Sequence, residues 1–242
     1  MEQITAIFLD IGNTNVNFSF NDKIGEVFSI STKSLSVRSS AFNFLKKYLP
    51  TKVVISSVVP IVSDLLAECC YEVGIDCKIL SFEDINLQTT LENNNELGID
   101  RAINAFYSMK KFGDSIIIDF GTALTFDIIL NRVYQGGMIF PGMNTAMHNL
   151  HIKTAKLPHI KIKEFQSGIG KNTTQAISFG MAIGYEGVLK NTIFFIERYY
   201  QSTFKIIFTG GSGKMFYNLI DGAIFEENLI LEYLVKEYGD LQ

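Results

Sequence analysis

The sequence predicts an α/β protein built from two similar domains. Two segments support this prediction, because each indicates an apolar strand, a tight Asp-x-Gly turn with Asn or Thr, and a second apolar strand. They are residues 7–20, which contain Asp10, and residues 116–130, which contain Asp119. A hairpin repeated in the two halves of a chain indicates duplicated domains. Helices that alternate with strands elsewhere favour the α/β class.

Alternating helices and strands are expected to follow each hairpin. In the first half these elements are a helix over 39–48, a strand over 53–57, a helix over 61–73, a strand over 78–80 and a helix over 100–112. In the second half they are helices near 144–156 and 174–199, a strand over 205–209, a helix over 214–220 and a final helix over 226–238. No Pro-rich or Ser-rich linker separates the halves. We therefore predict an N-terminal domain over 1–114 and a C-terminal domain over 115–242.

Composition limits the classes of function. The chain has 242 residues and 47% hydrophobic content, which is enough to bury a core in one large domain or in two compact ones. Its net charge is -4 and its pI is about 5.4, so it lacks the overall basic field that holds nucleic acid or an anionic membrane surface. We expect neither nucleic acid nor a membrane as a partner.

The expected location is the cytoplasm. Three cysteines make a poor disulfide framework, and the segment from Met1 to Ile4 lacks the positive region and apolar core of a secretory signal. The uncharged run over 133–152 is long enough to span a bilayer. Its Gly, Pro, Asn and Gln residues exclude a spanning helix, because they would break the helix and leave polar groups in lipid.

The two acidic turns suit a triphosphate and its metal. A carboxylate at the end of a buried strand can hold a cation, while turn amides and hydroxyls donate to phosphate oxygens. For one copy alone, a β-hairpin in which Asp and Gly serve only the turn is the better interpretation. Two copies favour function, because a nucleotide held between domains needs a phosphate loop from each side.

A third turn follows the strand over 205–209, where Gly210 and Gly211 could let the backbone approach a ligand closely. An ordinary strand-to-helix turn is the alternative. A P-loop is excluded, because Phe208 stands where that pattern needs its first glycine and Met215 where it needs Ser or Thr.

Asp100 opens a predicted helix and is followed directly by Arg101. Asp is among the preferred helix-capping residues, so a cap is one interpretation. The other is a general base beside an anion-binding guanidinium group.

Together, the order and spacing of these motifs resemble those of type III pantothenate kinases, members of the ribonuclease H-like superfamily of actin, hexokinase and acetate kinase. The resemblance covers most of the chain. Its segments are Asp10-Ile11-Gly12-Asn13-Thr14, Ile55-Ser56-Ser57-Val58-Val59-Pro60, Gly98-Ile99-Asp100-Arg101, Asp119-Phe120-Gly121-Thr122-Ala123-Leu124-Thr125, Gly136-Gly137-Met138-Ile139-Phe140-Pro141-Gly142, Gly170-Lys171-Asn172-Thr173 and Thr209-Gly210-Gly211.

The resemblance implies two ribonuclease H-like domains with a central cleft. The implied activity is the ATP-dependent phosphorylation of pantothenate to 4'-phosphopantothenate, the first step of coenzyme A biosynthesis. The implied first ATP phosphate loop consists of Asp10, Ile11, Gly12, Asn13, Thr14, Asn15, Val16 and Asn17. From the second turn, Thr122 would contact ATP.

The resemblance also implies the remaining roles in the site. Asp100 would be the proton acceptor, and Gly98, Ile99, Asp100 and Arg101 would border the pantothenate pocket. Thr173 would touch pantothenate across the interface of a homodimer. Asp119 would bind a monovalent cation, K⁺ or NH₄⁺, and we expect Mg²⁺ to accompany the phosphates near Asp10.

The sequence departs from the family pattern in three places. Ile99 replaces the usual alanine, Leu124 replaces a usual threonine, and Asn17-Phe18-Ser19 stands where a glycine is common. None of these changes removes a carboxylate. Ile99 leaves open a related kinase that acts on another hydroxylated substrate. A non-catalytic regulatory relative is a second alternative, and the three retained carboxylates and the lack of a basic face argue against it.

Overall fold

The chain folds into two compact units, as seen in a computed structural model that describes residues 4–21, 26–162 and 164–239. Unit 1 comprises Met1–Tyr107 and Asn228–Gln242, and unit 2 comprises Ser108–Glu227. Residues 1–3, which entered the expectation about a secretory signal, lie outside the described residues. The predicted single boundary before Ser115 differs from this division, because the C-terminal segment rejoins unit 1.

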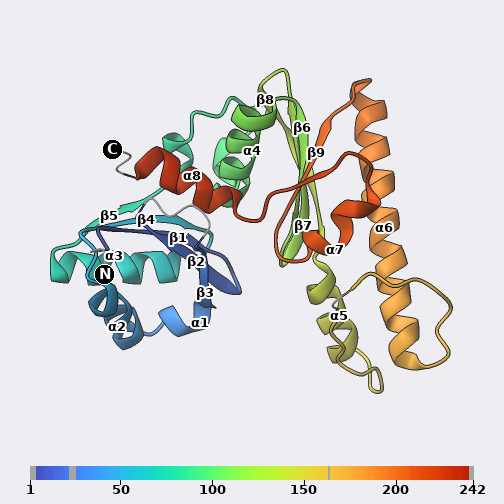
Figure 1. Cartoon of the computed structure of the whole chain (residues 1–242), viewed down its shortest axis with the longest axis horizontal. Coiled ribbons are helices and arrows are strands. Elements are labelled where there is room, and N and C mark those ends of the chain that lie inside the picture. Colours follow the sequence, from blue (N-terminus) through green and yellow to red (C-terminus); the bar gives the residue numbers. More distant parts are fainter. Residues whose placement is uncertain (1–3, 22–25, 163, 240–242) are drawn as a thin grey trace. The chain divides into compact units, whose positions relative to one another are not determined.

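Unit 1 contains a five-stranded mixed sheet (Figure 1). Its strands are β1 (Ala6–Ile11), β2 (Asn15–Phe20), β3 (Phe28–Ser31), β4 (Lys52–Ser57) and β5 (Asp76–Ile79), in the order β3-β2-β1-β4-β5. The pairs β1–β2 and β2–β3 are antiparallel, whereas β1–β4 and β4–β5 are parallel. The predicted hairpin therefore forms one side of a sheet whose other side is parallel.

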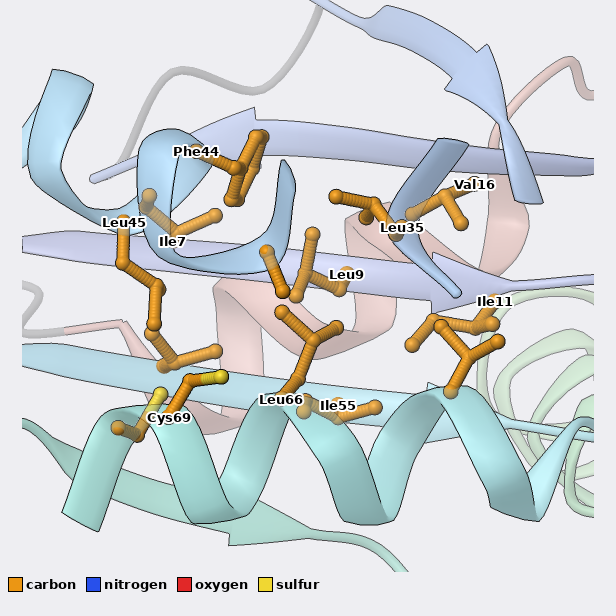
Figure 2. Close-up of a cluster of buried hydrophobic side chains, with 14 of the residues drawn as sticks. Ile7, Leu9, Ile11, Val16, Leu35, Phe44, Leu45, Ile55, Leu66 and Cys69 are labelled. Carbon is orange, nitrogen blue, oxygen red and sulfur yellow. The ribbon is translucent and has the colours of Figure 1, made fainter. Parts of the chain in front are cut away.

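The helices of unit 1 lie on both faces of this sheet. They are α1 (Thr32–Leu35), α2 (Arg38–Tyr48), α3 (Pro60–Val73), the first part of α4 (Ile99–Phe112) and α8 (Leu229–Tyr238), with short 3₁₀ turns at Phe82–Asp84 and Asn94–Glu96. In Figure 1, α2 and α3 cover one face and α8 lies against the other. Alternation along β1 turns Ile7, Leu9 and Ile11 toward the core under α2 and α3. Figure 2 shows these side chains packing against others that include Leu66 of α3.

Unit 2 repeats the plan of the first sheet. Its strands are β6 (Ser115–Phe120), β7 (Ala123–Leu130), β8 (Val133–Pro141), β9 (Lys205–Thr209) and β10 (Ile224–Phe225), in the order β10-β9-β6-β7-β8. The pairs β6–β7 and β7–β8 are antiparallel, and β6–β9 and β9–β10 are parallel. Each sheet is thus a hairpin extended by one antiparallel strand on one side and two parallel strands on the other. This is the predicted fold of two ribonuclease H-like domains.

One face of the second sheet is covered by helices of unit 2. These are α5 (Met143–Ile152), α6 (Thr173–Tyr200) and α7 (Gly213–Phe216), followed by a 3₁₀ turn at Tyr217–Leu219. Their apolar side chains share a core with β6 and β7, in which the rings of Phe120 and Phe216 stack with centroids 4.9 Å apart. Asn172 caps α6, because its side chain accepts a hydrogen bond from the backbone N–H of Gln175.

Three strands were absent from the prediction: β3, β8 and β10. The uncharged run over 133–152 proves to be β8 followed by α5. Within the described ranges, no helix has the length and apolar content that crossing a bilayer requires.

Candidate active site

The Asp10 turn joins β1 to β2 at one end of the first sheet. The backbone N–H of Gly12 donates to the carbonyl of Asn15 at 3.0 Å, which closes the turn, and residues 13–15 are exposed. A side chain on Gly12 would crowd this carbonyl, since a Cβ would lie 3.2 Å from it. The tight turn therefore presents residues 13–15 at the exposed ends of the two strands.

Asp10 has two polar neighbours in the sheet. It is directly paired with Asn17 on β2 and Ser56 on β4, so the three side chains share one face. Ser56 is fully buried, and its hydroxyl has no hydrogen-bond partner within the described part of the chain. A ligand group bound beside Asp10 would supply the hydrogen bond that this buried hydroxyl lacks. The sequence reasoning had assigned Ser56 no role, because the β1–β4 register is a long-range property.

Thr32 stabilises the same turn through two hydrogen bonds. Its hydroxyl donates to the carbonyl of Gly12 at 2.7 Å, and its backbone N–H donates to the carbonyl of Thr14 at 3.0 Å. Thr32 is buried, so these bonds fix the turn from behind. Sequence reasoning missed this residue, which lies outside the motif and after β3.

Asp100 lies in unit 1 with the Asp10 turn. The backbone N–H of Val58 donates to the carbonyl of Ile11 at 3.1 Å, which joins the end of β4 to the turn. A Cβ on Gly98 would lie 3.8 Å from Val58 Cγ1 and 2.6 Å from Asp100 Oδ1. Gly98 therefore lies against both residues, and only a glycine leaves room for the carboxylate there. Asp100 Oδ1 also accepts the backbone N–H of Arg101 at 2.7 Å.

The Asp119 turn of unit 2 has the corresponding geometry. Asp119 is directly paired with Thr125 on β7 and Thr209 on β9, so a carboxylate again shares a face with two polar side chains. Gly121 N–H donates to the carbonyl of Ala123 at 2.9 Å, and Thr122 is exposed at the tip of the turn.

Two glycines outside this turn pack so closely against it that neither position has room for a side chain. A Cβ on Gly210 would lie 2.4 Å from Asp119 Oδ1, so the predicted Gly210-Gly211 turn approaches the carboxylate closely. A Cβ on Gly142 would lie 2.2 Å from the carbonyl oxygen of Gly121, and Gly142 N–H donates to the carbonyl of Thr122 at 3.0 Å. The sequence contained Gly142 in a motif but gave no indication of this contact.

Thr173 lies on a different element of unit 2, in the first turn of α6. It lines an open groove of about 580 Å³ together with Leu150, Leu157 and Met181. The groove is apolar on its α5 side and polar near the start of α6. Among the predicted site residues, those of the Asp10 turn and Asp100 thus lie in unit 1, and Asp119, Thr122 and Thr173 lie in unit 2.

Oxygen atoms dominate both acidic turns. Carboxylate, hydroxyl and amide oxygens are the ligands that Mg²⁺ and other hard cations prefer, so the donor set fits the predicted cations. Within the described residues there is no group of three or more His, Cys, Asp and Glu side chains placed to hold a metal ion.

Two sheets of the same plan, each ending in an acidic turn, make up the ribonuclease H-like fold that the sequence predicts. Solved structures show the same fold. A structure from Campylobacter jejuni named for the Baf family of transcriptional activators has a TM-score of 0.64 at 23% identity, covering 95% of this chain and 96% of that one. A Sinorhizobium meliloti structure named for 2-dehydro-3-deoxygalactonokinase has a TM-score of 0.58 at 11% identity, covering 96% and 95%.

Sequence comparisons identify the family. The family model for type III pantothenate kinase matches residues 6–194. A type III pantothenate kinase from Sulfurihydrogenibium sp. (strain YO3AOP1) is 34% identical over 245 residues, covering 95% of this chain and 94% of the relative. One from Persephonella marina is 32% identical over 253 residues, covering 96% and 97%. The chain belongs to the type III pantothenate kinase family, which confirms the predicted family and its kinase activity in coenzyme A biosynthesis.

Proposed function

We propose that this chain transfers the γ-phosphate of ATP to the primary hydroxyl of pantothenate, with Asp100 as the base and the two acidic turns as the phosphate-binding elements. The observation that supports this proposal most directly is the matching register of polar side chains at the two turns. Asp10 aligns with Asn17 and Ser56, as Asp119 aligns with Thr125 and Thr209. Phosphoryl transfer depends mainly on alignment and charge neutralisation, and these groups are suited to both.

The Asp10 turn contributes donors to the phosphates in this proposal. Backbone N–H groups and the side chains of Asn13, Thr14 and Asn15 are at the exposed tip, while Thr32 keeps the turn in one conformation. Ser56 gives a further hydroxyl on the same face as Asp10. From the second turn, Thr122 donates its hydroxyl to the nucleotide.

Asp100 accepts the proton of the attacking alcohol. Its Oδ1 accepts a hydrogen bond from the backbone N–H of Arg101, which helps to fix the orientation of the carboxylate. The side chain of Arg101 orients the pantothenate carboxylate. Gly98 and Ile99 border the same pocket, and Thr173 approaches pantothenate from the partner subunit of a homodimer.

Two cations complete the proposed site. When bound, Mg²⁺ near Asp10 and K⁺ or NH₄⁺ at Asp119 offset the negative charge of the triphosphate. Asp10 and Ser56 would hold the first ion or its water, and Asp119 with the two threonines beside it would hold the second. Activity is expected to rise when Na⁺ is replaced by K⁺ or NH₄⁺ at constant ionic strength.

The test is the Asp100→Asn variant, assayed with Mg-ATP, K⁺ and pantothenate for the phosphorylated product. Asparagine keeps the Oδ1 acceptor for Arg101 N–H and removes the base, so turnover should fall by roughly 10²- to 10⁴-fold while ATP binding is retained. Asp64→Asn is the control, because Asp64 is an exposed carboxylate on α3.

Wild-type turnover in the Asp100→Asn variant would remove Asp100 from the proposed role. A wild-type protein that binds ATP but forms no product from pantothenate would refute the substrate assignment. A panel of hydroxylated substrates with the Ile99→Ala variant would then show whether this departure from the family pattern changes the acceptor.

A further inference from the structure

A buried carboxylate lies behind the second acidic turn and has no place in the mechanism above. Asp127 stands on β7, two residues after Thr125, with a relative exposure of 0%. It accepts a hydrogen bond from the Tyr134 hydroxyl at 2.7 Å and another from the Thr125 hydroxyl at 3.2 Å. Moving a carboxylate out of water costs free energy unless hydrogen-bond donors replace the lost water. We therefore looked for a role that would explain why Asp127 is buried.

The hydrogen bond to Asp127 determines what the Thr125 hydroxyl can do on its other side. A hydroxyl has one proton to donate, and here Asp127 receives it. The Thr125 oxygen therefore offers only lone pairs to any other neighbour. Thr125 is directly paired with Asp119 across the sheet, and its relative exposure is 8%. An oxygen restricted to accepting thus stands beside the carboxylate of the second turn.

The first sheet provides an internal comparison. The residue paired with Asp10 is Asn17, and the position two residues further along β2 is Ser19, with a relative exposure of 1%. The same strand of the same fold therefore forms with a small hydroxyl in place of the carboxylate. Asp127 is not required by the architecture, and it occurs in the copy to which we assign the monovalent cation.

We propose that Asp127, anchored by Tyr134, is a positioning residue that makes the Thr125 hydroxyl oxygen a ligand for the monovalent cation at Asp119. This inference rests on the cation site in the proposed function. With its lone pairs free to face the site, the Thr125 oxygen can coordinate K⁺ or accept a hydrogen bond from NH₄⁺. A hydroxyl that pointed its proton at the site would disfavour both ions.

The decisive variant is Asp127→Asn, because asparagine preserves shape and reverses polarity. The Tyr134 hydroxyl needs an acceptor, which the asparagine carbonyl provides, and the amide NH₂ then faces Thr125. Thr125 now accepts from residue 127 and turns its own proton elsewhere. Thr125→Val removes the hydroxyl altogether, and Thr125→Ser retains it.

The readout is the rise in melting temperature as K⁺ replaces Na⁺ at constant ionic strength, without substrates, which reports cation binding independently of turnover. Wild type and Thr125→Ser should respond alike. Asp127→Asn should need about 10- to 100-fold more K⁺ for half of the response, the usual effect of removing support behind a metal ligand. Thr125→Val removes the ligand itself, so its K⁺ requirement should rise at least as much. Ser19→Ala is the matched control, because it changes the corresponding buried position in unit 1 and should leave the K⁺ requirement unchanged.

The outcomes separate this inference from the proposed function. If Asp119→Asn abolishes the K⁺ response while Asp127→Asn and Thr125→Val leave the K⁺ requirement at the wild-type value, Asp127 serves stability alone and the inference is overturned. If the wild type does not respond to K⁺, or Asp119→Asn responds like the wild type, the cation site itself is wrong. If Asp127→Asn does not fold, Thr125→Val alone decides, since an unchanged K⁺ requirement there overturns the inference.

Discussion

Replacing Gly210 with alanine should displace the Asp119 carboxylate. Gly210 has φ +80°, a left-handed conformation that costs an L-residue roughly 1–2 kcal/mol. The new Cβ would also lie 2.4 Å from Asp119 Oδ1 and 2.8 Å from backbone atoms of Phe120. Overpacking of this kind typically costs about 1–3 kcal/mol. The two effects together predict a loss of roughly 2–5 kcal/mol in the free energy of unfolding.

Gly113 offers a matched control for the backbone part of this cost. It has φ +78°, nearly the same as Gly210, but a Cβ added there would meet nothing within 4 Å. Gly113→Ala should therefore lose only the roughly 1–2 kcal/mol of left-handed strain. The difference between the two variants isolates the collision with the Asp119 turn.

The assay is urea denaturation of both variants followed by circular dichroism, with the K⁺ response of the melting temperature as a second measurement. Gly210→Ala should be less stable than Gly113→Ala by at least about 1 kcal/mol and should lose its K⁺ response. Equal stabilities, together with a wild-type K⁺ response in Gly210→Ala, would show that the carboxylate is not held where the structure places it.

Three further predictions concern unit 1. Burial raises the pKa of Asp84, but hydrogen bonds from Lys78 and from nearby groups outweigh it and hold this pKa below its usual value. The ionised carboxylate therefore adds to the free energy of unfolding above the unfolded pKa of about 3.9, and this contribution is lost as pH falls through the folded pKa. Asp84→Asn should lower the free energy of unfolding by roughly 1 kcal/mol at pH 7 and leave it unchanged in strong acid, as measured by urea denaturation. The Cys70 thiol donates to Cys77 and lowers the pKa of Cys77, so Cys70→Ala should move the midpoint of Cys77 alkylation by iodoacetamide to higher pH. Leu66→Ala should cost roughly 2–5 kcal/mol in the free energy of unfolding, because Leu66 is fully buried between α3 and the sheet.

Each of these predictions has a clear contrary result. A cost for Asp84→Asn that persists unchanged below the folded pKa would contradict the pKa assignment. An alkylation midpoint that stays in place without Cys70 would mean that the hydrogen bond does not tune Cys77. For the core, Ile61→Ala on the exposed side of α3 is the comparison, and a Leu66→Ala variant no less stable than it would contradict the packing.

Local motifs were sufficient to predict the acidic turns. Asp10 and Asp119 were found because each stands at the end of an apolar run and is followed by a glycine turn, and the structure places both at the ends of central strands. The strand β8 was not predicted, because Gly136 and Gly137 interrupt its apolar pattern. The strand β10 has two residues, too few for any periodicity.

Long-range pairing accounts for the parts of the site that the sequence did not reveal. Ser56 becomes a neighbour of Asp10 only through the β1–β4 register, and Thr32 reaches the turn from beyond β3. The role proposed for Asp127 similarly depends on its hydrogen bond from Tyr134 on the next strand. No pattern within a short window carries such information, whereas the turn residues carry their conformational preference themselves.

The return of α8 to unit 1 has a consequence for synthesis on the ribosome. This helix buries Leu229, Leu231 and Leu234, its Glu232 accepts a hydrogen bond from Tyr107, and Lys52 donates to the Tyr238 carbonyl. All of unit 2 must be translated before these residues emerge. Until then, the face of the first sheet that α8 covers stays exposed in the nascent chain. A nonsense mutation shortly before Leu229 would thus leave the earliest translated domain, rather than the latest, as the target of chaperones and proteases.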